Sequence, residues 1–369
     1  MDKIKFWFLV RTIRISRWEY WSSYIIYLPA LPYLLLLWMK SKSFFFFNAA
    51  NPGIAYGGFL MESKWTIHND APAGYFPDTM LVHPAEDPDA VFEKIKQTFS
   101  FPFIVKPDVG SQGRGVAVVK SRQQWYAYHR QCPVPYLVQE KIVYPMEAGV
   151  FYVRDPTRAR GKITGIVQKH FIQVTGNGYS TMLQLLVQNP RYLLQVKSLQ
   201  TILGTDALNT IIPEGETRTI SDIGNHARGS LFVNASEKIS EQLTTTIDNL
   251  CRQFKGFYFG RLDIRFHSWE HLEQGKDFAV IELNGSGSEP THIYDPDNTI
   301  FEAWKEIRLH WKLMQEISSY HHATGVPYLT MKEGIQLFRD HLALNEKLAH
   351  FHPRLDDVHT SHLHATVTT

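Results

Sequence analysis

Cysteine is scarce in this chain. Only two of the 369 residues are cysteines, Cys132 and Cys251, and they lie far apart in the sequence. This excludes a disulfide scaffold and fits a reducing compartment. The net charge is only +2, so the composition gives no indication of nucleic-acid binding. With 44% apolar and 20% charged residues, the chain is not a disordered one and is long enough for two or three domains.

Charge and aromatic residues are present, but they are unevenly distributed. Residues 1–43 hold seven basic side chains against Asp2 and Glu19, a net charge of +5, whereas the remainder of the chain is slightly acidic. Between Trp21 and Met39 there is no charged residue. The seven basic residues that flank this run are Lys3, Lys5, Arg11, Arg14, Arg17, Lys40 and Lys42.

The uncharged run raises the question of a membrane. A spanning helix needs about 20 apolar residues, and Pro29 and Pro32 would kink one here. Tryptophan and tyrosine favour the headgroup level, and basic charge on both sides favours an anionic leaflet. We therefore expect residues 1–43 to form a helical segment in peripheral contact with the inner, cytoplasmic face of a membrane. A true span and a hairpin packed on the protein's own core are the alternatives. A cleaved signal peptide is disfavoured, because the run is too aromatic and lacks a small-residue cleavage site.

Hydrophobic periodicity predicts the elements beyond residue 43. We expect a reduced region at 44–100, a subdomain with a glycine-rich loop at 101–145, a second subdomain at 146–320, and a helix with a histidine-rich tail at 321–369. Six histidines near the end could form a zinc site, but their spacing is not diagnostic and a polar tail is expected. The predicted strands are 44–47, 101–106, 115–120, 136–141, 257–266 and 277–284; the predicted helices are 60–68, 87–100, 122–131, 236–254, 298–318 and 332–350.

Two of the predicted strands carry charged residues in alternation. Arg261, Asp263 and Arg265 should share one strand face, and Glu282 and Asn284, together with Val280, should share another. If the strands are neighbours, one aspartate, one glutamate and one asparagine present hard oxygen ligands that suit Mg²⁺. The plainer alternative is an edge hairpin with solvated charges.

A second pattern joins a lysine to a glycine-rich turn. Lys106 ends an apolar strand, and Gly110, Gly113 and Gly115 lie in the turn that follows. Such glycines let backbone N–H groups approach phosphate oxygens, but no helix follows, so neither a P-loop nor a Rossmann motif is indicated. Another strand ends at residues 138–142, where backbone groups could read a base. By themselves the glycines are a weak signal.

Taken in order, these motifs resemble the ATP-grasp superfamily, on its D-alanine–D-alanine ligase and cyanophycin synthetase side. The resemblance covers roughly residues 60–295 and implies an α+β ATP-grasp fold with two subdomains gripping ATP. The motifs that carry it are Ser63-Lys64, Val105-Lys106-Pro107, Gly110–Gly115, Gln139-Glu140-Lys141, Glu147, Lys169, Thr175–Thr181, Arg261-Leu262-Asp263 and Glu282-Leu283-Asn284.

The resemblance implies a role for each matching residue. Lys64, Lys106 and Lys169 would contact phosphates, and Arg261 would face the acyl intermediate. Glu140 would bind adenine together with the backbone of Lys141 and Ile142. Glu147 would hold the ribose. The loop residues Gly110, Ser111, Gln112, Gly113 and Gly115 would fold over the triphosphate of ATP, and Asp263, Glu282 and Asn284 would bind Mg²⁺, with two ions expected.

The resemblance implies an ATP-dependent ligase that activates a carboxylate as an acyl phosphate and joins it to an amine or a similar nucleophile. The substrates are expected to be small or lipid-linked, and the oligomeric state stays open. The alternatives are a phosphotransferase on the same fold and a membrane-associated nucleotide-binding module without turnover. The N-terminal substrate domain of the relatives is reduced here, and Gly285–Pro290 replaces their usual motif, so D-alanine specificity does not follow. Further candidate residues for the acceptor site are Asn225, His226, Arg228, Ser286 and Ser288.

Overall fold

The computed structural model describes residues 3–110, 113–221, 224–353 and 355. The chain forms two compact units, one of residues 1–59 and 144–331 and the other of residues 60–143 and 332–369. The predicted region 44–100 is therefore divided between the units, and so is the predicted region 321–369. Every strand pairing among the described residues is antiparallel, and helices separate the strands, which confirms the α+β class.

The second unit is built on a four-stranded sheet in the order β1 (Thr79–Val82), β4 (Tyr136–Glu140), β2 (Phe103–Pro107) and β3 (Ala117–Val119). Its helices are α4 (Lys64–Asn69), α5 (Pro88–Thr98), α6 (Arg122–Gln131) and α13 (Met331–Ala349). The first residue of α13, Met331, belongs to the other unit. Side-chain oxygens of Ser63, Asp87 and Ser121 cap the first three. Ile95, Trp125 and Leu348 pack in one core with the inner residues of the sheet.

The first unit is built on a five-stranded sheet in the order β11 (Phe278–Asn284), β10 (Phe259–Phe266), β5 (Met146–Val153), β6 (Lys162–His170) and β9 (Leu231–Asn234). A separate ribbon of β7 (Ile172–Thr175) and β8 (Thr217–Ser221) shares a core with nearby helices. The α-helices of this unit beyond the N-terminal segment are α7 (Met182–Leu186), α8 (Pro190–Leu193), α9 (Val196–Leu208), α10 (Glu241–Gln253), α11 (Trp269–Glu273) and α12 (Ile300–Ala323). Short 3₁₀ turns are η3 (Phe46–Ala49), η4 (Ala55–Gly58), η5 (His226–Arg228), η6 (Ser236–Lys238) and η7 (Thr291–Tyr294).

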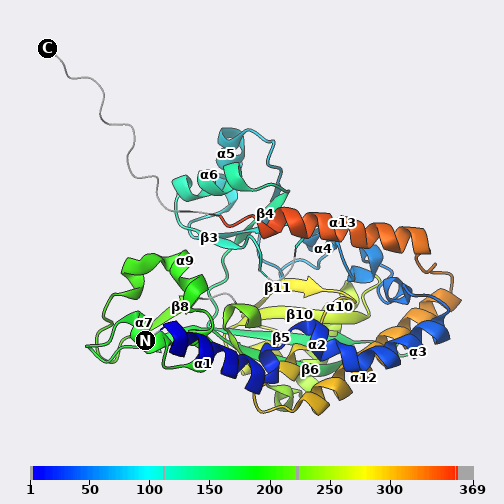
Figure 1. Ribbon diagram of the computed structural model, residues 1–369. Helices are drawn as coiled ribbons and strands as arrows, with labels where there is room; N and C mark the ends of the chain where they lie inside the picture. Colours follow the sequence, from blue (N-terminus) through cyan, green and yellow to red (C-terminus); the bar gives the residue numbers. More distant parts are fainter. Residues whose placement is uncertain (1–2, 111–112, 222–223, 354, 356–369) are drawn as a thin grey trace. The chain divides into compact units, whose positions relative to one another are not determined.

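The N-terminal segment is a chain of helical elements, and its part from residue 23 to residue 41 packs along α12. Figure 1 shows α3 (Leu31–Ser41), drawn in blue, beside α12, drawn in orange. Ile26 and Ala30 pack with Ile307, and Leu37 packs with Met314. From Ser23 to Ser41 the chain is long and apolar enough to cross a membrane by length and composition alone, and 17% of it is buried. The elements are α1 (Lys3–Ser16), η1 (Trp18–Tyr20), α2 (Ser23–Tyr27), η2 (Leu28–Ala30) and α3 (Leu31–Ser41).

The predicted strand at 44–47 is wrong. Its phenylalanines instead lead into the turn η3, where Phe46 and Phe47 are buried in a core with Met314 and Ile317 of α12. A continuous run of aromatic residues is compatible with a buried strand and with a buried turn, so its hydrophobic pattern does not distinguish the two. The other predicted elements agree with the structure to within a few residues, and the connection between β10 and β11 also contains α11.

Candidate functional site

A buried network of ion pairs lies on one face of the five-stranded sheet. Asp263 of β10 is only 4% exposed, and the Arg261 guanidinium donates to both of its oxygens, Nε to Oδ1 at 3.0 Å and Nη2 to Oδ2 at 3.2 Å. The two residues are neighbours on the same strand face, as the alternation predicted. A planar guanidinium bound at two points is held in one orientation, so Asp263 fixes the direction of Arg261.

The network continues across β5 to β6. Lys169 lies 3.1 Å from Asp263 Oδ1 and 3.0 Å from Glu147 Oε1, and Arg265 Nε lies 2.9 Å from Glu147 Oε2. Strand pairing produces this arrangement, because Glu147 is directly opposite Lys169 on one side and Arg265 on the other. Three cations and two anions thus converge on one patch of the sheet.

Burial and charge act in opposite directions on these groups. Burial raises the pKa of Asp263, but Arg261 and Lys169 lower it to about 2. Burial lowers the pKa of Lys169, but the carboxylates of Asp263 and Glu147 raise it above its ordinary value. Asp263 and Lys169 are therefore both ionised at neutral pH. A buried ionic network is costly to desolvate and is more typical of a functional site than of a stabilising core.

Glu282 and Asn284 of β11 lie beside this network. Asp263 pairs with Glu282, and Arg261 with Asn284, across the β10–β11 ladder. The amide nitrogen of Asn284 is buried and has no hydrogen-bond partner within the described part of the chain. Two carboxylates and this amide on one sheet face fit Mg²⁺, which prefers oxygen ligands.

One detail of the predicted pattern is wrong. Val280 does not share the face of Glu282, because the register of β10 and β11 shifts between Asp263 and Ile264. This bulge inserts Ile281 and turns Val280 to the opposite face, where it is fully buried and pairs with Ile264. The kink restricts the polar face of β11 to its last residues.

The loop after β11 is held by a segment that the sequence did not mark as functional. Ser286 N and Gly287 N donate to the carbonyl oxygens of Gly57 and Gly58, both at 2.9 Å. Asn51, fully buried, secures this segment by donating to the carbonyls of Gly57 and Phe259. An isolated Asn-Pro-Gly predicts only a turn, so the sequence carried no signal for this role.

The predicted acceptor residues take different positions around the loop. The Ser286 hydroxyl is buried and has no hydrogen-bond partner among the described residues, whereas the Ser288 hydroxyl donates to Gly285 O at 2.6 Å. Arg261 Nη1 donates to Glu289 O at 3.1 Å, which brings the loop to the ionic network. Tyr294 contacts the Glu289 carboxylate through its hydroxyl at 3.3 Å.

The segment Gly224–Gly229 also approaches the network. A Cβ atom at Gly224 would lie 2.1 Å from Glu147 Oε1, so the backbone passes directly over that carboxylate. Asn225 caps η5 by accepting from Arg228 N. The ring of His226 stacks on Tyr20 and on Tyr294. Burial and Arg191 lower the pKa of His226 to about 3, so this histidine is neutral at physiological pH.

The resemblance segment Thr175–Thr181 connects β7 to α7. Asn177 Oδ1 accepts from the backbone N–H of Ser180, and Thr181 caps α7 in a reciprocal capping box with Gln184. These contacts define a tight turn before a helix. The relation of this turn to the site, which the resemblance implies, stays a prediction.

In the second unit, the predicted phosphate-binding residues surround the glycine-rich loop. Lys106 is buried on β2, and Lys64, at the start of α4, donates through Nζ to Gly110 O at 2.7 Å. Gly113 and Gly115 have φ of 69° and 70°, a conformation that glycine adopts without strain. Ser111 and Gln112 lie outside the described residues.

The predicted adenine-binding residues are at the end of β4. Glu140 is exposed there, and its backbone N–H donates to Asp78 O at 2.9 Å. Lys141 and Ile142 follow in irregular chain. The described histidines, together with cysteine, aspartate and glutamate, form no cluster of three that could hold a metal, so the predicted zinc alternative gains no support within that part of the chain.

Comparisons with known proteins give likenesses of structure only. No family model matches the chain, and no curated protein matches its sequence. Among solved structures, the chain is similar to a D-alanine–D-alanine ligase from Bacillus anthracis at 12% identity, covering 74% of this chain and 72% of that one, with a TM-score of 0.40. It is also similar to a bifunctional glutathione synthetase from Pasteurella multocida at 12% identity, covering 75% of this chain but 39% of that one, with a TM-score of 0.37. A carboxyaminoimidazole ribonucleotide synthase from Aspergillus clavatus, complexed with ATP, matches at 11% identity over 61% of this chain and 44% of that one, with a TM-score of 0.37.

Proposed function

We propose that this protein is an ATP-dependent, ATP-grasp-type ligase that activates a carboxylate as an acyl phosphate and joins it to an amine or a similar nucleophile. The observation that carries the proposal is the buried network in which Asp263 orients Arg261 and holds Lys169, beside Glu282 and Asn284. Oriented cations and oxygen ligands on one sheet face are what phosphoryl transfer and acyl transfer require.

Each unit carries residues that we propose for ATP. In the second unit, Lys106 and Lys64 are the cations for the phosphates, the glycine-rich loop supplies backbone N–H groups, and the end of β4 takes adenine. In the first unit, Glu147 stays the residue proposed for the ribose, although both of its oxygens are ion-paired and the Gly224 backbone lies over one of them.

Asp263, Glu282 and Asn284 would hold Mg²⁺. The buried, unpaired Asn284 nitrogen is a donor, so it favours an acceptor such as a phosphate oxygen beside the metal, while the Asn284 amide oxygen would be the metal ligand. When bound, the metal would neutralise charge on the phosphates. Lys169 already lies against Asp263 and would share that task.

The reaction would proceed in two balanced steps. A carboxylate oxygen of the first substrate attacks the γ-phosphorus of ATP, the bond to the bridging oxygen breaks, and ADP leaves. The amine then attacks the acyl carbon, a proton leaves the nitrogen, and inorganic phosphate departs. Arg261, held by Asp263 and by Glu289 O, is positioned to stabilise the oxyanion of the second step.

The ligase reaction can be tested by ADP release in a screen of carboxylates, with hydroxylamine as the acceptor. A hydroxamate that depends on ATP and on the carboxylate is expected, and Arg261→Lys should reduce it because an ammonium cannot reproduce the bidentate contact. A stable phosphorylated product in place of the hydroxamate would identify a phosphotransferase. Absence of turnover with tight ATP binding would identify a non-catalytic module.

We further propose that the N-terminal segment attaches this enzyme to the inner face of a membrane, where its substrate is lipid-linked or membrane-proximal. One side of α2 and α3 packs on α12, whereas Tyr24, Leu28 and Met39 on the other side are 90%, 63% and 66% exposed. An element packed on its own protein along one side suits the plane of the interface better than a span.

The attachment is tested with the full chain. Leu28→Ser, Leu36→Ser and Met39→Ser together remove exposed apolar area but leave the packed side unchanged, so folding should be retained and sedimentation with anionic vesicles should be lost. Undiminished sedimentation would contradict the attachment. It would leave the ligase proposal untouched, because ADP release is measured separately.

A further inference from the structure

A cavity in the first unit lies at the end of α3, apart from the ionic network. Its volume is about 760 Å³, and it is lined by the turn that follows α3 and by the end of α12 with the chain beyond it. The lining includes Lys40 and Lys42 and contains no aspartate or glutamate. No ion pair joins either lysine to another described residue. The cavity is therefore electropositive without an internal counter-ion.

Hydroxyl groups line the end of the cavity near Ser319. Gln315, almost fully buried, donates through Nε2 to Ser41 Oγ at 3.2 Å and to Ser319 Oγ at 2.6 Å. The Tyr328 hydroxyl lies beside these two serines on the cavity wall. A phenol hydroxyl can donate a hydrogen bond as well as accept one, so this wall can offer a donor to an anion.

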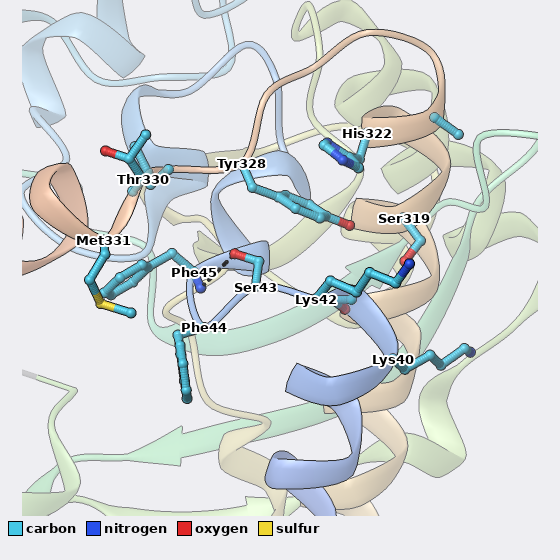
Figure 2. Close-up of a pocket in the computed structure, with 13 residues that line it drawn as sticks. Lys40, Lys42, Ser43, Phe44, Phe45, Ser319, His322, Tyr328, Thr330 and Met331 are labelled. Atoms are coloured by element: carbon cyan, nitrogen blue, oxygen red, sulfur yellow. Dashed lines mark hydrogen bonds between the residues drawn. The ribbon is translucent and has the colours of Figure 1, made fainter.

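The opposite end of the cavity is apolar. Figure 2 shows Phe44 and Met331 on the side away from Ser319, while the Lys42 ammonium and the Tyr328 hydroxyl lie toward Ser319. Phe44 and Met331 are 50% and 51% exposed. A polar end with donors and an exposed apolar end match an amphiphile that carries an anion.

The cavity lies at the end of α3, the helix that carries exposed apolar residues proposed to contact the membrane. Met39, one of the exposed apolar residues of α3, directly precedes Lys40 in that helix, and Lys40 lines the cavity. Lys42 has φ of 52°, the left-handed conformation in which it caps the C-terminus of α3, with its N–H donating to Met39 O. This cap leads the chain from the helix into the turn that lines the cavity.

We infer that this cavity binds the phosphate of an anionic glycerophospholipid, with Lys40, Lys42 and the Tyr328 hydroxyl as its donors and the glycerol end of the lipid beside Phe44 and Met331. The inference rests on the membrane attachment proposed above and adds to it a headgroup site. Non-specific attraction to a charged surface needs no cavity, whereas a phosphate site makes binding depend on headgroup chemistry.

The test compares two variants that lose the same charge. Lys40→Gln/Lys42→Asn changes the cavity, and asparagine tolerates the left-handed conformation of residue 42. Arg11→Gln/Arg14→Gln removes two exposed charges from α1. Each basic residue near an anionic surface contributes about fivefold in affinity, so both variants should bind phosphatidylcholine vesicles containing oleate about 30-fold more weakly than the unchanged chain does.

Vesicles of phosphatidylcholine and phosphatidylglycerol separate the two variants. Here the cavity variant should lose at least about tenfold more affinity than the Arg11/Arg14 variant, because it also loses charge-assisted hydrogen bonds. Tyr328→Phe should weaken binding to phosphatidylglycerol vesicles and leave binding to oleate vesicles unchanged.

Three results would overturn the inference. Equal losses of the two double variants on both vesicles would mean that the lysines act only as surface charge. Free glycerol phosphate that stabilises the protein as much as the vesicles do would identify a site for a soluble anion. If the unchanged chain binds neither vesicle, the membrane attachment itself fails, a result distinct from the first two.

Discussion

Glu19 and Arg191 form a buried ion pair of 2.8 Å, although 172 positions separate them in the sequence. Their side chains are 2% and 7% exposed. Next to this pair, Tyr20 stacks on His226 and Trp18 stacks on Tyr294. The N-terminal segment is therefore joined to the loop that passes over Glu147, and its position bears on the candidate site as well as on membrane contact.

Breaking this pair should destabilise the first unit. Arg191→Ala leaves the buried Glu19 carboxylate with only the half-exposed Arg17, 3.8 Å away, and should lower the free energy of unfolding by about 3 kcal/mol. Glu19→Gln/Arg191→Met removes both charges and should recover most of the loss. Denaturant titration of the single and double variants measures the coupling, and strictly additive losses would contradict it.

Asp263 should make stability depend on pH below about 4. Its pKa falls from the ordinary value to about 2 in the fold, so its contribution is fully present above the unfolded pKa and is lost as pH falls through 2. A shift of this size corresponds to roughly 2 kcal/mol. The difference in unfolding free energy between the unchanged chain and Asp263→Asn should therefore shrink between pH 4 and pH 2. A difference independent of pH would show that the carboxylate is not held ionised.

Lys106 should be needed for ATP binding. Lys106→Ala removes the buried cation of β2 and should abolish the rise in melting temperature that Mg-ATP gives the unchanged chain. Lys120→Ala, at an exposed position beyond β3 in the same unit, is the matched control and should leave the rise intact. An unaltered rise in Lys106→Ala would remove the lysine from the phosphate site.

Gly224 should tolerate no side chain. Gly224→Ala places a Cβ against Glu147 Oε1 and 2.9 Å from Lys169 Cδ, so it should displace Glu147 and lower ADP release. Shortening the acid in Gly224→Ala/Glu147→Asp makes room and should restore part of the activity. If the double variant is no better than Gly224→Ala, the clash is not the cause of the loss.

Local patterns determined much of this protein from sequence. Alternation placed Arg261, Asp263 and Arg265 on one strand face, and hydrophobic periodicity located helices such as α5 and α6. These features depend on neighbours along the chain, so the sequence carries them directly. The lysine and the glycines of the loop in the second unit were found in the same way.

Tertiary structure alone decided the partners of these groups. Glu147 was expected only to hold the ribose of ATP, yet the strand order places it between Lys169 and Arg265. The bulge at Ile281 puts Val280 and Glu282 on opposite faces of β11. Phe46 and Phe47 form a turn rather than a strand because they pack against α12. Glu19 pairs with Arg191, and Asn51 donates a hydrogen bond to the backbone of β10; more than 150 positions separate the partners in each case. Such contacts follow from strand order and from packing between distant segments, and no periodicity within a single segment encodes them.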